Sequence, residues 1–169
     1  CAQLDWLSMR QLAGNDTNVI EGFVDCMAVA AGQPTGVFFN SFRQAVHESA
    51  RLSLANRSAE ARARVREFVD TVTPASRPRL RRRLPLSLAH TARRLERDLK
   101  LRLGVMAVFW ISPEAADALR RTMIEAAEEL ARQELAAGDP DRKKVEEMAV
   151  ALRSARSRKP NPGESPARP

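Results

Sequence analysis

The sequence contains no tyrosine, only two cysteines and only two histidines in 169 residues. Cys1 and Cys26 give neither the spacing of a metal site nor a disulfide framework. The longest apolar run, residues 103–111, is too short to cross a membrane and contains a glycine. Few glycines and many Ala, Leu, Arg and Glu residues favour helix over sheet. The sequence therefore predicts a helical protein without a membrane-spanning helix.

Recognisable catalytic and metal-binding patterns are absent as well. His47 precedes Glu48 but lacks the second histidine of a zinc-binding helix, and His90 has no evident partner. No glycine-rich phosphate loop or nucleophile elbow is present. Cys26 falls on the apolar face of an expected helix, which is typical of a core position. The sequence therefore predicts that the protein is not an enzyme and holds no cofactor and no metal.

Positive charge is concentrated in the middle of the chain. The formal net charge is +7, and residues 51–110 are strongly basic while the segments on either side are acidic or neutral. Arginine binds phosphate groups and releases counterions from DNA, and it also binds anionic membrane surfaces. A solvated basic helix face is the simpler alternative. The predicted phosphate-binding residues are Arg81, Arg82 and Arg83.

Residues 22–46 read as a helix, a tight turn and a second helix. Gly32 is suited to end the first helix, and Pro34 is suited to the first turn of the next one. In DNA-binding proteins the second helix of such a pair enters the major groove. An ordinary helical hairpin is the alternative. The segment 34–42 itself contains no basic residue, so most phosphate contacts must come from elsewhere in the chain.

This segment resembles the helix-turn-helix of TetR-type transcriptional repressors, which are bacterial regulators. The resemblance rests on Ala31, Gly32, Pro34, Gly36, Phe38, Phe39, Asn40 and Phe42. It implies a cytoplasmic, homodimeric protein that binds duplex DNA and responds to a small-molecule effector. Gly36 is expected where the second helix comes close to other elements or to DNA, so that a bulky residue there clashes. The DNA-contacting residues that the resemblance implies are Thr35, Gly36, Val37, Phe39, Asn40, Ser41 and Arg43.

The whole chain is predicted to be all-α, with a helix-turn-helix-like segment, a helical bundle and a C-terminal antiparallel helix pair. A helix is expected over 35–54, and Ser58 is expected to cap another over about 59–72. Three prolines in residues 73–85 predict a Pro/Arg-rich linker. Residues 86–111 look helical, although the run at their end is also consistent with a short buried strand. The expected regions are 1–54, 55–158 and a disordered tail over 159–169.

Two helix starts are expected near the C-terminus, at Ser112 followed by Pro113 and at Asp139 followed by Pro140. The two helices carry apolar stripes and form an antiparallel pair over 113–157. These stripes fit either a homodimer interface or packing within one subunit. Met106, Phe109 and Trp110 are candidates for an effector pocket, with an ordinary core as the alternative.

A second hypothesis treats the chain as a non-enzymatic helical interaction protein. Mature bacterial lipoproteins begin with a lipidated cysteine, so Cys1 is consistent with a lipid anchor in the bacterial envelope. A fragment of a longer reading frame explains the same residue equally well. In this alternative the basic segment contacts an anionic membrane surface instead of DNA.

Overall fold

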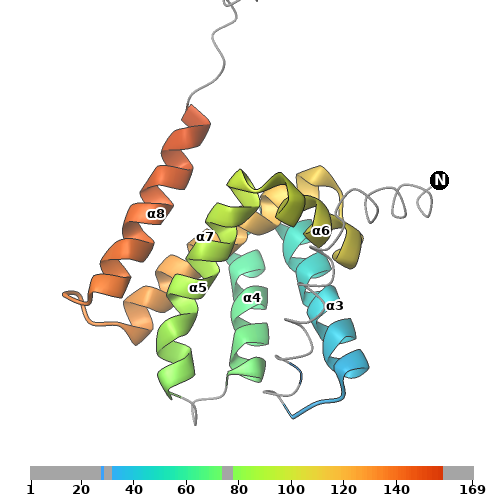
Figure 1. Ribbon diagram of the computed structural model, residues 1–169, viewed down its shortest axis with the longest axis horizontal. Helices are drawn as coiled ribbons and strands as arrows, with labels where there is room; N and C mark the ends of the chain where they lie inside the picture. Colours follow the sequence, from blue (N-terminus) through green and yellow to red (C-terminus); the bar gives the residue numbers. More distant parts are fainter. Residues whose placement is uncertain (1–27, 29–31, 74–77, 158–169) are drawn as a thin grey trace, which may run out of the picture.

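The computed structural model describes residue 28 and the ranges 32–73 and 78–157. Every element of regular structure in these ranges is an α-helix, as the sequence predicts (Figure 1). Most of the predicted helix before the turn and the predicted tail at 159–169 lie outside the described residues. The helices are α3 (Thr35–Leu54), α4 (Ser58–Val72), α5 (Pro78–Arg97), α6 (Leu99–Phe109), α7 (Pro113–Glu134) and α8 (Pro140–Ser157).

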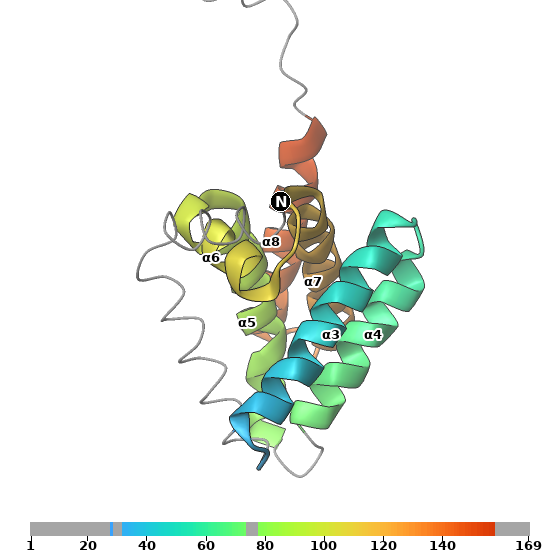
Figure 2. The same cartoon turned by 90° about the vertical axis from the view of Figure 1, so that its right-hand side faces the viewer.

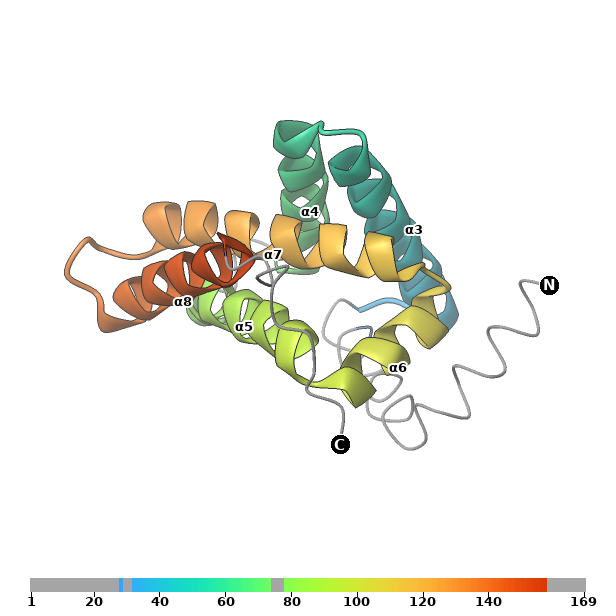
Figure 3. The same ribbon diagram turned by 90° about the horizontal axis from the view of Figure 1, so that it is seen from above.

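Helix α7 lies between two helix pairs. The pair α3 and α4 packs on one side of it and the pair α5 and α8 packs on the other, as Figure 3 shows from above. Helix α6 follows α5 and contacts α3. Figure 2 shows α6 on the same side of the molecule as α5, with α4 on the other side. In the part of the chain that the structure describes, α5 does not pack against α3 or α4, although the Arg81 side chain reaches Asp70 of α4. The two pairs therefore present their outer faces to opposite sides.

The core consists mainly of two clusters, and both include residues of α5 and α7. One cluster joins α3, α6 and α7 through residues such as Val46, Phe109 and Leu119. A second cluster packs Val145 and Leu152 of α8 against small residues of α5 and α7. Alanines at these contacts let the helix axes approach closely. The predicted antiparallel pairing of α7 and α8 is confirmed, and the apolar stripe of α8 is covered within the same chain.

The two predicted C-terminal helix starts are present. The Ser112 hydroxyl accepts a 3.1 Å hydrogen bond from the backbone N–H of Ala115. The Asp139 carboxylate accepts one of 2.9 Å from the N–H of Asp141. The cap predicted at Ser58 is wrong, because Ser58 already lies inside α4 and no side chain caps that helix. Side-chain acceptors thus define the starts of α7 and α8 but not of α4.

The predicted linker over 73–85 is wrong for its second half, because α5 begins at Pro78. Pro85 lies inside this helix, where it removes one backbone hydrogen bond. Its ring is fully buried, so packing compensates for the missing bond. The helix expected over 86–111 is instead split at Asp98, and its final run is helical rather than a strand.

The predicted turn before α3 is present. Gly32 adopts a left-handed conformation with φ +68°, and the N–H of Gln33 donates a 3.0 Å hydrogen bond to the carbonyl of Ala28. This bond spans five residues and is typical of a helix ending in a left-handed glycine. Helix α3 then begins at Thr35 and continues without a break to Leu54, as predicted.

Candidate nucleic-acid interface

The first turns of α3 present polar side chains to solvent. Thr35, Gly36, Asn40 and Ser41 are exposed, and Val37 keeps 56% of its surface accessible. The first turn contains no acidic residue, and no side chain caps its free N–H groups. These features leave the start of α3 compatible with a phosphate group, because helix N-termini attract anions.

The aromatic residues of α3 point the other way. Phe38 is 1% exposed and lies 5.8 Å, centroid to centroid, from Phe68 of α4. Phe42 stacks on the same Phe68 ring at 4.9 Å. Phe39 was expected to face DNA, but its ring stacks on Phe109 of α6 at 6.0 Å. This expectation is wrong because Phe39 joins α3 to the core cluster that lies under α6.

The steric role expected for Gly36 is also wrong. A Cβ atom built at this position meets no atom within 4 Å. Gly36 faces open space in the first turn of α3, so a larger side chain fits within this chain. The expectation that Gly36 lies close to bound DNA stays a prediction.

Arg43 is held by an aromatic ring. Its guanidinium lies 4.9 Å from the centroid of the Trp110 ring, within cation–π range. Trp110 ends α6 in a left-handed conformation with φ +54°, which is rare for a bulky residue. Nearby, His47 shares a hydrogen bond with the carbonyl of Phe109. These contacts attach the middle of α3 to the end of α6.

The three candidate residues of the effector pocket do not come together around a cavity. Met106 and Phe109 are 5% and 4% exposed and pack in the core between α3, α6 and α7. Trp110 is 53% exposed and lies on the surface. The pocket expectation is therefore wrong, because the apolar face of α6 is filled by neighbouring helices.

The three predicted phosphate-binding arginines have different environments. Arg81 donates to Glu134 at 2.8 Å, to Asp70 at 2.8 Å and to the carbonyl of Thr73. Hydrogen bonding to Glu134, and then to Asp70, raises the pKa of Arg81 above its ordinary value. Arg81 therefore anchors α5 to α7 and α4, and its assignment to phosphate binding is wrong.

The neighbouring arginines remain accessible. Arg82 is 67% exposed and pairs at 2.7 Å with Asp139, the residue that begins α8. The pKa of Asp139 is lowered, first by the N–H of Asp141 and then by Arg82. Arg83 is exposed and forms no ion pair with a described carboxylate. Two of the three predicted residues are therefore available to an anionic partner.

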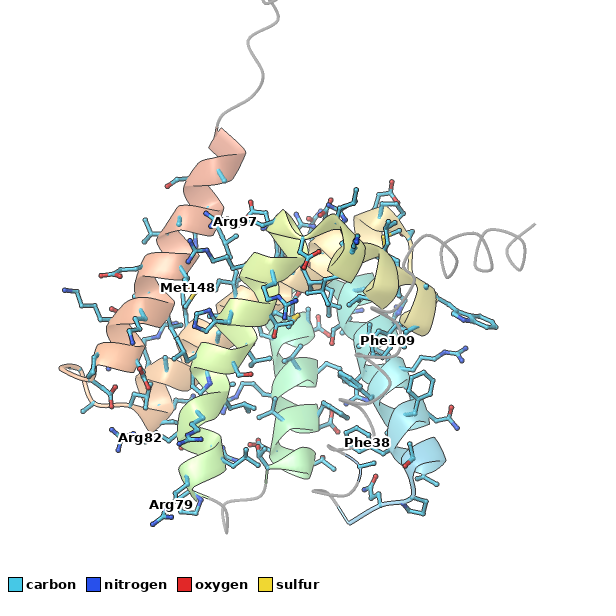
Figure 4. All side chains as sticks on the ribbon, viewed as in Figure 1. Phe38, Arg79, Arg82, Arg97, Phe109 and Met148 are labelled. Atoms are coloured by element: carbon cyan, nitrogen blue, oxygen red, sulfur yellow. The ribbon has the colours of Figure 1, made fainter. Side chains whose placement is uncertain are left out.

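The solvent face of α5 carries two groups of basic residues, one before and one after the uncharged residues 84–89. Successive helix residues are offset by about 100°, which places positions 79, 83, 90, 94 and 97 within a sector of about 60°. The only acid of α5, Glu96, lies outside this sector and pairs with Arg120 of α7. Figure 4 shows Arg79 and Arg97 toward opposite ends of the helix. We define the basic face of α5 as Arg79, Arg82, Arg83, His90, Arg93, Arg94 and Arg97.

The basic face ends in a shallow, open groove at the junction of α5 and α6, which we call the elbow. Its lining comprises Arg93, Arg94, Arg97, Asp98, Leu99 and Lys100. The Asp98 carboxylate accepts the N–H of Leu101 at 3.1 Å and approaches Arg94 at 3.5 Å. The N–H of Leu101, and secondarily Arg94, lowers the pKa of Asp98. The single acid of the elbow is therefore already engaged, and its cations dominate.

The exposed polar face of α3 and the basic face of α5 do not form one surface, because α7 lies between the two helix pairs. The residues that the structure describes contain no group of His, Cys, Asp or Glu able to hold a metal ion. None of their helices is long and apolar enough to span a membrane. Among the described residues, the strongest indication of function is therefore the positive charge gathered on the basic face of α5.

Comparisons with known proteins give no assignment. No protein-family model matches the chain, no curated protein matches it, and no solved structure matches its fold.

The sequence analysis predicts neither Gln44 as a contact nor a shared helix face for the arginines of the basic segment. Gln44 lies one turn after Asn40 on the exposed side of α3. The arginines of α5 at positions 79, 93, 94 and 97 share one face, which becomes visible only when the helix is continued through Pro85. The signal that identifies this face is the spacing of Arg79, Arg83, His90, Arg94 and Arg97 by four, seven, four and three residues, which begins within the predicted linker.

Proposed function

We propose that the protein is a DNA-binding regulator whose main contact with duplex DNA is the basic face of α5. The observation that carries the proposal is the absence of any acid from a helix face that holds six arginines. Helix α5 has 20 residues and is about 30 Å long. This length is close to one turn of duplex DNA, about 34 Å. Such a face matches the linear array of phosphates along a DNA strand.

The arginines of this face suit phosphate binding because most of them have no internal partner. Arg79, Arg83 and Arg97 are exposed and form no ion pair with any described carboxylate. Arg94 contacts Asp98 only at 3.5 Å, and both side chains are largely accessible. Such exposed pairs contribute little, so DNA phosphates can replace them.

Helix α3 supplies the groups that suit base recognition. Asn40 and Gln44 are exposed on successive turns, and amide side chains can form two hydrogen bonds to adenine in the major groove. Thr35 and Ser41 are exposed beside them and suit phosphate oxygens. In this proposal α5 provides affinity that is independent of sequence, and α3, on a separate surface of the molecule, is a second face suited to base recognition.

A homodimer through 113–157 remains part of the proposal with a restricted geometry. The apolar stripes of α7 and α8 are covered within the chain, so a second copy has to use their outer faces. Val150 is 58% exposed and, with Ala151, lies on the outer face of α8 among charged residues. This is the position in 113–157 that a partner copy would cover.

Binding of the full chain to a labelled 30-base-pair duplex, followed by fluorescence anisotropy at several salt concentrations, tests the proposal. The affinity is expected to fall steeply with salt, because each phosphate contact adds about 0.9 to the slope of log K against log salt. Vesicles containing anionic lipid serve as the competing target. Binding to vesicles without binding to the duplex would reject the proposal in favour of a membrane-associated interaction protein.

A further inference from the structure

The elbow carries an apolar side chain at the centre of its cations. Leu99 is 68% exposed, more than any other large hydrophobic residue in the described ranges. It is the first residue of α6 and lines the groove together with Arg94, Arg97 and Lys100. Because Leu99 is exposed to water, covering its side chain with a binding partner removes apolar surface from water and would favour binding.

The local backbone explains why Leu99 protrudes. Asp98 adopts an extended conformation, with φ −104° and ψ 99°, and this residue interrupts the helix between α5 and α6. Its carboxylate caps α6 through the N–H of Leu101, which fixes the start of that helix. Helix packing therefore holds Leu99 at the outer corner of the elbow rather than on a loop.

We propose that Leu99 is a wedge that enters the minor groove of duplex DNA and bends it at the elbow. The inference rests on the proposed function and adds a mode of binding to it. Proteins that kink DNA insert an apolar side chain between base pairs, and flanking cations hold the phosphates on either side. Here Arg94 and Arg97 precede Leu99, and Lys100 follows it. The elbow thus combines the two required chemistries in one groove.

The elbow lies between the basic face of α5 and helix α6. The basic face of α5 ends at Arg97, and α6 then leads from the elbow to α3, where Arg43 contacts Trp110. A straight duplex along α5 does not reach the exposed side of α3, because α7 separates the two helix pairs. A wedge in the minor groove kinks a duplex toward its major groove, away from the protein, so the bend at Leu99 does not require contact with α3.

Duplex DNA fits the elbow better than a lipid surface does. Helices that lie in a membrane interface bury a broad apolar face beside their basic residues. The basic face of α5 has no such stripe, because Ala89 and Ala92 are buried against α7 and α8 and Leu95 is buried in the cluster shared with α3, α6 and α7. One exposed leucine is sufficient for a wedge between two base pairs and insufficient for a membrane-inserted helix face.

Energy transfer between dyes at the two ends of a 30-base-pair duplex tests the wedge. The wild-type chain is expected to bend the duplex by at least about 20°. Leu99→Ala should still bind, with an unchanged salt slope because no charge is lost, and should leave the duplex nearly straight. Leu54→Ala is the matched control, because Leu54 is 48% exposed at the far end of α3. This control should bend DNA as the wild type does.

The outcomes separate the wedge from the proposed function. DNA binding without bending by the wild type, or equal bending by wild type and Leu99→Ala, would overturn the wedge and leave DNA binding in place. Failure of the wild type to bind the duplex would overturn both. Binding to anionic vesicles that depends on Leu99, without DNA bending, would assign the elbow to lipid. Leu99→Met keeps an apolar side chain at this position and, unlike Leu99→Ala, should bend the duplex as the wild type does if the proposal is correct.

Discussion

Replacing Arg81 with glutamine is expected to destabilise the fold without weakening DNA binding. Replacing Arg83 with glutamine is expected to weaken DNA binding without destabilising the fold. The two arginines lie two positions apart on α5, but they have opposite environments. The Arg81 side chain is 17% exposed and joins Glu134 of α7 to Asp70 of α4. Arg83 is exposed and pairs with no described carboxylate.

The structure sets the size of the Arg81 effect. Glutamine leaves the Glu134 carboxylate, which is 28% exposed, without its cation and also removes the contact with the carbonyl of Thr73. Hydrogen bonds to charged groups contribute about 1.5–3 kcal/mol, and partial exposure reduces this to a total of about 2 kcal/mol. For a chain of this size such a loss lowers Tm by about 4–8 °C. The exposed Arg83→Gln change should stay within about 0.5 kcal/mol of the wild type.

Thermal unfolding followed by circular dichroism, combined with anisotropy titrations on the 30-base-pair duplex, measures both effects. Arg83→Gln should lose about 0.9 from the salt slope, and Arg81→Gln should keep the wild-type slope at a temperature where it is folded. A normal Tm for Arg81→Gln together with a reduced salt slope would show that Arg81 contacts DNA. The division between anchoring and phosphate-binding arginines would then be refuted.

Two further predictions concern helix ends. Trp110→Gly should be more stable than Trp110→Ala by about 1 kcal/mol, because both remove the indole but only alanine keeps a Cβ in the left-handed conformation; equal urea midpoints would contradict the strain. The pKa values of Asp98 and Asp139 are lowered by backbone N–H groups, so their stabilisation is present above the ordinary carboxyl pKa and is lost as pH falls through the folded-state pKa. When the pH is lowered from 7 to 3, the free energy of unfolding measured in urea titrations should therefore fall less for the double variant Asp98→Asn, Asp139→Asn than for the wild type. An identical pH dependence of the two proteins would refute this assignment.

The sequence predicted helix boundaries well where a local signal sets them. Gly32 marks the turn before α3, and the pairs at Ser112 and Asp139 mark the starts of α7 and α8, because each boundary depends on hydrogen bonds between near neighbours. The prediction at Pro85 was wrong because proline removes a hydrogen bond within its own helix, whereas the packing that compensates for this loss comes from other helices. Its ring is buried against other helices, and that contact is not encoded in the neighbouring residues.

The candidate site was predicted less completely for a related reason. The sequence shows that arginines are abundant in residues 77–102, but ion pairs across the fold decide which of them are available. Arg81 is engaged by residues 11 and 53 positions away, and Phe39 is covered by a residue 70 positions away. Helical spacing could have identified the shared face of α5, whereas the partners of Arg81 and Phe39 required the tertiary structure.

The most direct test of the central claim, that the basic face of α5 binds duplex DNA, is the salt slope of a triple variant. Replacing Arg83, Arg94 and Arg97 with glutamine should lower the slope of log K against log salt by about 2.7, at about 0.9 for each phosphate contact. The matched control replaces Arg132, Lys143 and Lys144, which are exposed cations of the α7 and α8 region. It should keep the wild-type slope. Equal loss of slope in both variants would show only a response to net charge, and an unchanged slope in the α5 variant would contradict the claim.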